Sequence, residues 1–169
     1  MQGQDIALLL KLATLNEPTV LSKELTASLF ISPSEVSKSL KRCVEADLLY
    51  VSGLEKRVNR TALLEFLAHG LKYVFPPIRV SMARGIPTAA ATEPLKSRML
   101  DDGEPPTVWS YAEGTVRGLS IAPLYKAAPK AALLNAKFHR VLALSDAIRS
   151  GRTRERNLAI ELLEKEIHG

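Results

Sequence analysis

The chain has 169 residues, a formal net charge of +5 and a single cysteine, Cys43. Its 46% apolar and 24% charged residues are typical of a globular protein. No apolar run approaches the roughly 20 residues that a spanning helix needs, which argues against a membrane protein. The first residues contain no basic cluster, and a lone cysteine forms no intramolecular disulfide. We therefore expect a cytoplasmic protein that does not bind a membrane.

Basic and acidic residues are unevenly distributed. Residues 1–70 contain 8 Lys or Arg and 8 Asp or Glu, so their formal charge is zero. Residues 71–128 contain 7 basic and 5 acidic residues, and residues 129–169 contain 8 and 5. The positive excess therefore lies in the second half, and an anion-binding surface in the first part of the chain has to be a local patch.

Two helices are predicted first. In DIALLLKLATLNEP, apolar residues recur at helical spacing from Ile6 to Ala13, and Asn16–Pro18 ends the pattern. In LSKELTASLF, Ser22 is placed to cap a short second helix. Almost no loop separates this second helix from the next helical pattern.

The stretch ISPSEVSKSLKRCVEADLLYVSG contains one of the clearest helix starts in the chain. Ser32 is a favoured N-cap residue, Pro33 suits the first helical position, and Glu35 is placed to close a capping box. The helix is expected to span residues 33–46. Its apolar stripe is formed by Val36, Leu40, Cys43 and Val44. Its other side is polar and basic and carries Ser34, Ser37, Lys38, Lys41 and Arg42.

A hairpin and a fourth helix are expected next. Leu48–Ser52 and Lys56–Arg60 are predicted as short strands joined at Gly53, because glycine supplies the positive φ that tight hairpin turns need. In TALLEFLAHGLKY, apolar residues return to helical spacing, with a cap near Thr61. The order is thus helix, helix, helix, hairpin, helix.

The segment 76–128 has a different composition. Eight of the ten prolines lie between Pro76 and Pro129, so long helices are not expected there. The apolar and aromatic residues between Val108 and Tyr125 are too numerous for a disordered linker. We expect an ordered, irregular segment with one or two short strands that packs on the rest of the chain.

Residues 129–169 are predicted to form a helical hairpin. One helix runs to Ser150, Gly151 is placed as its C-cap, and Thr153 as the N-cap of the last helix. The last helix has a broad apolar stripe, formed by Leu158, Leu162, Leu163 and Ile167. We expect this stripe to form a dimer interface, and packing within one chain is the alternative.

The order of the N-terminal elements is that of a winged helix-turn-helix, whose third helix enters the major groove of DNA. The stretch VLSKELTASLFISPSEVSKSLKRCVEADLLYVSG resembles the DNA-binding core of MarR-like winged-helix transcriptional regulators, over about residues 5–75. We therefore expect a mainly α-helical fold with a small β-hairpin wing. Its expected parts are a winged helix-turn-helix domain (1–75), an irregular Pro/Gly-rich segment (76–128) and a C-terminal helical hairpin (129–169).

The resemblance implies a sequence-specific transcriptional regulator, most simply a repressor, that binds double-stranded DNA as a homodimer. The helix 33–46 would then contact bases through Ser34, Ser37, Lys38, Lys41 and Arg42. The wing would contact phosphates through Lys56, Arg57 and Arg60. The wing is short, however, and negative charge lies close by, at Glu45, Asp47 and Glu55. The alternative is a basic helix face that is only solvated.

A second basic cluster, RSGRTRER, could contact phosphates or an acidic partner through Arg149, Arg152, Arg154 and Arg156. The alternative is that these arginines favour a helix C-terminus or pair with Asp146 and Glu155. The C-terminal part also faintly resembles proteins encoded beside nucleotidyltransferases in toxin–antitoxin-like loci. That resemblance implies an antitoxin-like protein that neutralises a toxin encoded nearby and can regulate its own genes. A winged helix used only for protein contacts is a third reading.

Patterns typical of enzymes are weak in this sequence. The three histidines have no metal-ligand spacing with each other or with Cys43, which lies on the apolar stripe and is expected in the core. EGTVRG lacks the Lys-Ser/Thr of a phosphate-binding loop. We therefore expect no enzymatic activity, no metal and no cofactor.

Overall fold

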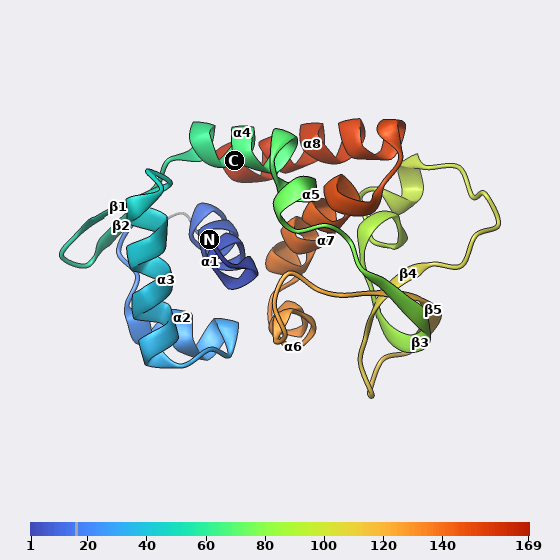
Figure 1. The fold of residues 1–169 in the computed structure, drawn as a ribbon, viewed down its shortest axis with the longest axis horizontal. Coiled ribbons are helices and arrows are strands. Elements are labelled where there is room, and N and C mark those ends of the chain that lie inside the picture. The colour runs from blue at the N-terminus through green and yellow to red at the C-terminus, as the bar shows by residue number, and fades with distance from the viewer. Residues whose placement is uncertain (16) are drawn as a thin grey trace.

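The computed structural model describes residues 1–15 and 17–169 and shows an elongated, mainly helical molecule (Figure 1). The first helices are α1 (Gly3–Ala13), α2 (Ser22–Leu29), α3 (Pro33–Glu45), α4 (Arg60–His69) and α5 (Leu71–Val74). The last three are α6 (Ala128–Leu133), α7 (Ala136–Ser150) and α8 (Thr153–His168). The strands are β1 (Leu49–Ser52), β2 (Glu55–Val58), β3 (Arg79–Pro87), β4 (Thr107–Ser110) and β5 (Val116–Ile121).

The helix α1 lies at the centre of the molecule. It is buried from Asp5 to Leu10 and again at Leu12 and Ala13, so the predicted amphipathic helix is covered around most of its circumference. On one side it contacts α2 and α3, and on the other it contacts α7 and α8 (Figure 1). One apolar core therefore runs through all three predicted parts of the chain. The predicted helix stop at Asn16 lies outside the described residues.

The connection between α2 and α3 is short, as predicted. Phe30 ends α2 in the left-handed conformation (φ 54), and Ser32 is the N-cap of α3. The Oγ of Ser32 accepts a hydrogen bond from the Glu35 backbone N–H (3.3 Å), which confirms the predicted cap. The predicted capping box is wrong, because the Glu35 carboxylate bonds to Gln4 instead. Leu21, not Ser22, precedes the first helical residue of α2.

The predicted hairpin is present, with strand boundaries that differ by one or two residues. The strands β1 and β2 pair antiparallel from Leu49↔Val58 to Ser52↔Glu55, and Gly53 in the turn has φ 58. The helix α4 begins after Asn59, whose Oδ1 accepts a hydrogen bond from the Ala62 N–H (3.2 Å). The predicted cap at Thr61 is therefore wrong by two positions, because the asparagine ends the strand and caps the helix.

The segment 76–128 is more regular than predicted. The strand β3 pairs antiparallel with both β4 and β5, and β4 pairs parallel with β5, so the three strands close on one another. Glycines permit this closure: a Cβ on Gly85 would lie 1.9 Å from the Trp109 carbonyl oxygen, and one on Gly118 would lie 2.0 Å from that of Pro106. The glycines were predicted to indicate irregular structure, but they lie where the backbones of two strands approach closely.

The C-terminal part contains three helices where two were predicted. Asn135 interrupts the predicted helix 129–150, because its Oδ1 accepts a hydrogen bond from the Phe138 N–H (2.8 Å) and starts α7 as a separate helix. Gly151 is the C-cap of α7, as predicted, but Thr153 is the first residue of α8 and Arg152 its N-cap. None of the helices among the described residues combines the length and the apolar character that crossing a bilayer requires.

The apolar stripe of α8 packs inside the chain. Leu162, Leu163 and Ile167 are buried, and α8 contacts α4 and α7. The stripe therefore packs within one chain, as in the alternative, and the prediction of a dimer interface at this stripe is wrong.

Candidate nucleic-acid interface

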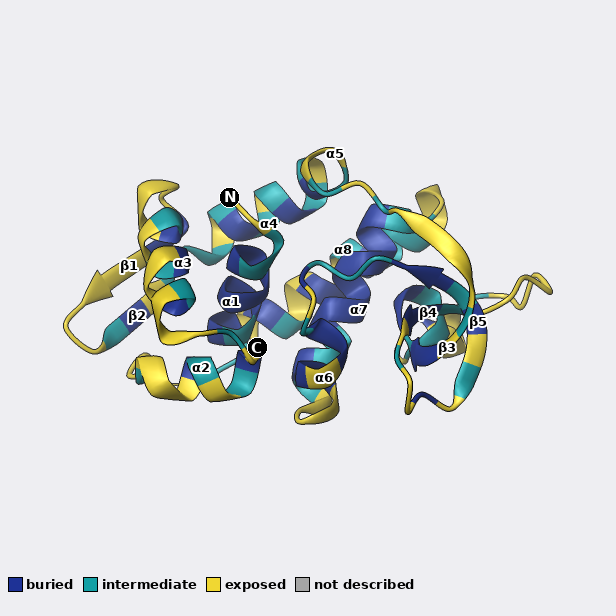
Figure 2. Ribbon diagram, turned by 60° about the horizontal axis from the view of Figure 1, so that its bottom comes forward, coloured by how far each residue is buried: buried dark blue, intermediate teal, exposed yellow. Residues whose placement is uncertain are grey.

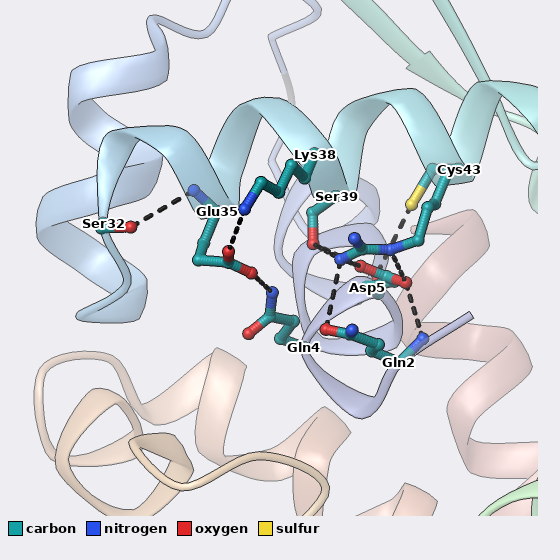
Figure 3. Close-up of polar contacts among 9 residues, drawn as sticks. Gln2, Gln4, Asp5, Ser32, Glu35, Lys38, Ser39 and Cys43 are labelled. Carbon is teal, nitrogen blue, oxygen red and sulfur yellow. Dashed lines mark hydrogen bonds and ion pairs between the residues drawn. The ribbon is translucent and has the colours of Figure 1, made fainter.

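The helix α3 is fixed to α1 by a buried carboxylate, that of Asp5 (Figure 3). Its oxygens accept hydrogen bonds from Nε (2.8 Å) and Nη2 (2.7 Å) of Arg42. Ser39 Oγ and the Gln2 backbone N–H also donate to this carboxylate. The Cys43 thiol donates to the Asp5 carbonyl oxygen (3.8 Å), so two successive turns of α3 contact the first turn of α1. This arrangement fixes the rotation of α3 about its own axis.

The protonation of this pair follows from its contacts. Burial alone raises the pKa of Asp5, but hydrogen bonds from Arg42, Ser39 and the Gln2 amide outweigh burial, and the pKa is lowered overall. The hydrogen bond to Asp5 likewise raises the pKa of Arg42. Both groups are therefore charged at neutral pH.

Two positions on α3 face other directions than predicted. Arg42, predicted to contact bases, turns its guanidinium onto Asp5, and only 24% of its side chain is exposed. Val44, predicted to be buried, is 42% exposed. Ser39 is buried instead. The buried side of α3 thus consists of Val36, Ser39 and Cys43, which lie three or four residues apart.

The outward side of α3 carries the remaining predicted contacts, Ser34, Ser37, Lys38 and Lys41, all exposed. Lys38 Nζ lies 3.0 Å from Oε1 of Glu35, whose other oxygen accepts from Gln4 Nε2 (2.7 Å; Figure 3). Lys41 Nζ lies 3.8 Å from Glu45 Oε1. Such exposed pairs are worth only about 0–1 kcal/mol, so both ammonium groups can exchange their carboxylate for another anion.

The hairpin supplies fewer basic contacts than predicted. Lys56 is buried, and its Nζ donates to the carbonyl oxygens of Val20 and Leu54. The half-buried Arg60 donates from Nη2 to the Ala13 carbonyl oxygen (3.3 Å). Of the three residues predicted to contact phosphates, only Arg57 is exposed, and it pairs with Glu55 (3.0 Å). The assignment of Lys56 as a phosphate contact is therefore wrong, because its side chain points into the molecule.

A shallow groove lies between the end of α3 and the hairpin, and its lining is mixed rather than basic. Its charged residues are Asp47, Glu55 and Arg57. Its other lining residues are Val44, Leu49, Tyr50, Val51 and Ser52. The hairpin also exposes the large side chains of Tyr50, Val51 and Leu54, so its surface is partly apolar.

The C-terminal arginines do not join α3 in one site. Arg149 is buried in an ion pair with Asp146 and donates to the carbonyl oxygens of Phe75 and Ala122, so its prediction as a phosphate or partner contact is wrong. Arg152 and Arg154 are exposed and Arg156 is half-buried. They lie where α8 begins, at the end of the molecule away from α3 (Figure 1).

Cys43 is buried, as predicted, and burial raises the pKa of its thiol to about 12. A thiol with this pKa stays protonated at neutral pH and is a poor nucleophile. Among residues 1–15 and 17–169, no three His, Cys, Asp or Glu side chains are arranged to hold a metal ion.

Comparison with known proteins gives no match among family models, curated proteins or solved structures, so functional inference rests on the geometry of the chain itself.

Proposed function

We propose that the protein is a sequence-specific DNA-binding transcriptional regulator, with α1, α2, α3 and the β1–β2 hairpin as a winged helix-turn-helix. The observation that carries the proposal is the outward face of α3: two serines and two lysines, all exposed, on a helix that follows α2 after a short turn. Lysine can donate to the O6 and N7 acceptors of guanine, and serine can donate or accept at base edges. The contacts around Asp5 hold this face in one orientation.

The proposed contacts are Ser34, Ser37, Lys38 and Lys41, with Arg57 of the hairpin on a phosphate. Because Arg42, Lys56 and Arg60 have partners inside the chain, this set is smaller than the resemblance implies. Few phosphate contacts mean a shallow salt dependence, with a slope of log affinity against log salt of about −0.9 for each phosphate neutralised. Repression would follow from occupying a promoter, by analogy with the fold.

The proposed regulator acts as a homodimer, because two recognition helices about one DNA turn apart read two half-sites. The apolar stripe of α8 is covered within the chain, so the dimer surface in this proposal lies elsewhere.

Replacing Lys38 and Lys41 together with alanine should weaken binding to DNA from the region upstream of its own gene by about 10- to 100-fold. The salt slope should change little, because in this proposal the two lysines contact bases and the phosphate contact of Arg57 is kept. Gel-shift titrations of the full chain at several salt concentrations measure both quantities.

The matched control is Lys126→Ala with Lys165→Ala, which removes the same charge from exposed positions outside α3. This control should bind with nearly wild-type affinity. Equal affinity of the α3 variant and the wild type would refute α3 as the recognition helix. Equal loss in both variants would show a response to net charge alone.

The exposed apolar side chains of the hairpin favour a second candidate function, binding of a protein partner. Tyr50, Val51 and Leu54 expose large apolar side chains where a DNA-binding wing usually carries basic ones. The partner would be a protein encoded nearby, such as a toxin that the chain neutralises. Co-purification with the neighbouring gene product that is lost in Tyr50→Ala, with DNA binding unchanged, supports this candidate. Full retention of the complex in Tyr50→Ala counts against it.

A further inference from the structure

The three-stranded sheet carries a concentrated positive charge. Its strands contain Arg79, Arg84 and Arg117 and no acidic residue, and all three arginines are exposed. Within the described part of the chain, the ion pairs involve none of these arginines. The sheet lies at the end of the molecule opposite the hairpin, so this surface is separate from α3 (Figure 2).

Two of the arginines face each other directly. Arg84 of β3 is the register partner of Arg117 of β5, and side chains in such pairs have Cβ atoms about 4.5–5.5 Å apart. Like charges in this position destabilise a sheet. A carboxylate bound between the two guanidinium groups would remove the repulsion and accept paired hydrogen bonds from each group.

Apolar side chains accompany the arginines. Met82 pairs with Leu119 two positions along the ladder from Arg84 and Arg117, so these four side chains share one face of the sheet. On the same strand Met82 is 44% and Val80 is 69% exposed. Arginine and methionine together, without lysine, are typical of protein interfaces, and apolar side chains gain nothing from a phosphate backbone. This composition favours a protein partner over a nucleic acid.

Part of β3 also has an unpaired edge. β4 pairs with β3 only over Gly85–Pro87, whereas β5 pairs with it from Arg79 to Gly85, with a register shift between Arg79 and Met82. In the described residues, the edge of 79–83 that faces away from β5 therefore has no neighbouring strand, and the next carbonyl oxygen, that of Arg84, accepts a hydrogen bond from the Tyr111 N–H (3.1 Å). An extended segment can add to such an edge through backbone hydrogen bonds. A second copy of β3 fits poorly, because antiparallel pairing would bring its arginines against those of the first copy.

We propose that residues 79–83 of β3, together with the side chains of Arg84 and Arg117, form a docking edge for an extended segment of a partner protein. Acidic and apolar residues alternate at every second position of this segment, so that both kinds of side chain lie on the face of Arg84 and Met82. An acidic side chain binds between Arg84 and Arg117, and an apolar one covers Met82. This docking edge does not depend on DNA binding by α3.

The test is fluorescence anisotropy of the full chain with a labelled peptide in which glutamate and valine alternate at every second position, with serine between them. Matched probes are a lysine–valine peptide and a single-stranded oligothymidylate. The wild type should bind the glutamate peptide about tenfold or more tightly than either matched probe. Arg84→Glu with Arg117→Glu should lose this binding and gain affinity for the lysine peptide. Lys38→Ala with Lys41→Ala should bind the glutamate peptide as the wild type does.

Circular dichroism of the Arg84→Glu, Arg117→Glu variant verifies its fold, and Arg84→Gln with Arg117→Gln is the fallback variant with the same expected loss. Four results would overturn the proposal. The glutamate peptide does not bind, or it binds wild type and variants equally. The oligothymidylate binds more tightly than the peptide. Sedimentation shows a wild-type dimer and a monomeric variant, which would assign the edge to a second copy.

Discussion

Arg149→Ala should lower the free energy of unfolding by about 3–5 kcal/mol, because it leaves the buried carboxylate of Asp146 without its counter-ion. The side chains of the pair are only 3% and 1% exposed. Thr88 Oγ1 and Trp109 Nε1 donate to the other carboxylate oxygen, each at 2.7 Å. The guanidinium of Arg149 also satisfies two backbone carbonyl groups. Urea denaturation followed by circular dichroism measures the loss.

The matched control is Arg152→Ala, three residues along the chain, where the arginine is exposed. Its free energy of unfolding should stay within about 0.5 kcal/mol of the wild type. Arg149→Lys should lie between the two, because an ammonium group restores the charge but not the paired geometry. If Arg149→Ala were as stable as Arg152→Ala, Arg149 could not be buried against Asp146.

Local patterns allowed most helices and the hairpin to be predicted. The Ser32–Pro33 start of α3 and the glycine turn between β1 and β2 depend on a few neighbouring residues, and the structure has both. Local patterns did not predict the three strands between residues 79 and 121, because their backbones approach each other so closely that only glycine fits at the contact. A crossing between residues 12 or 24 positions apart, such as Gly118 with Pro106 or Gly85 with Trp109, leaves no periodic signal in the sequence.

The partners of charged side chains could not be predicted. The sequence does not distinguish basic residues with partners inside the molecule from their exposed neighbours. Each of the former bonds to a group distant in the chain: Arg42, Lys56 and Arg149. The neighbours that stay exposed are Lys41, Arg57 and Arg152. The missed residue with the largest consequence is Asp5. A carboxylate in the first helical turn is usually explained by the helix dipole, and only the fold reveals that α3 covers it. Ser39 and Arg42, three residues apart on α3, were the only sequence signal of an acceptor on that side.

Asp5→Ala should lower the free energy of unfolding by about 2–3 kcal/mol at neutral pH, because the charged hydrogen bonds to Arg42 and the bond to Ser39 are lost. The loss is smaller than at Arg149, since water can solvate the partly exposed Arg42. The pKa of Asp5 is lower in the folded than in the unfolded chain, so its ionised form stabilises the fold above about pH 4. This contribution disappears as the pH falls through the unfolded and then the folded pKa.

Asp5→Asn tests the pH dependence directly, because it removes the titrating group and keeps its shape. Its stability should fall less steeply than that of the wild type below about pH 4, and the two curves should approach each other at the acid end. Glu45→Gln is the control on α3: its carboxylate lies 3.8 Å from the exposed Lys41, so the variant should follow the wild-type curve closely. Parallel curves for wild type and Asp5→Asn would contradict the pair with Arg42. Because Asp5 orients α3, DNA binding by folded Asp5→Asn should also be weaker than that of Glu45→Gln.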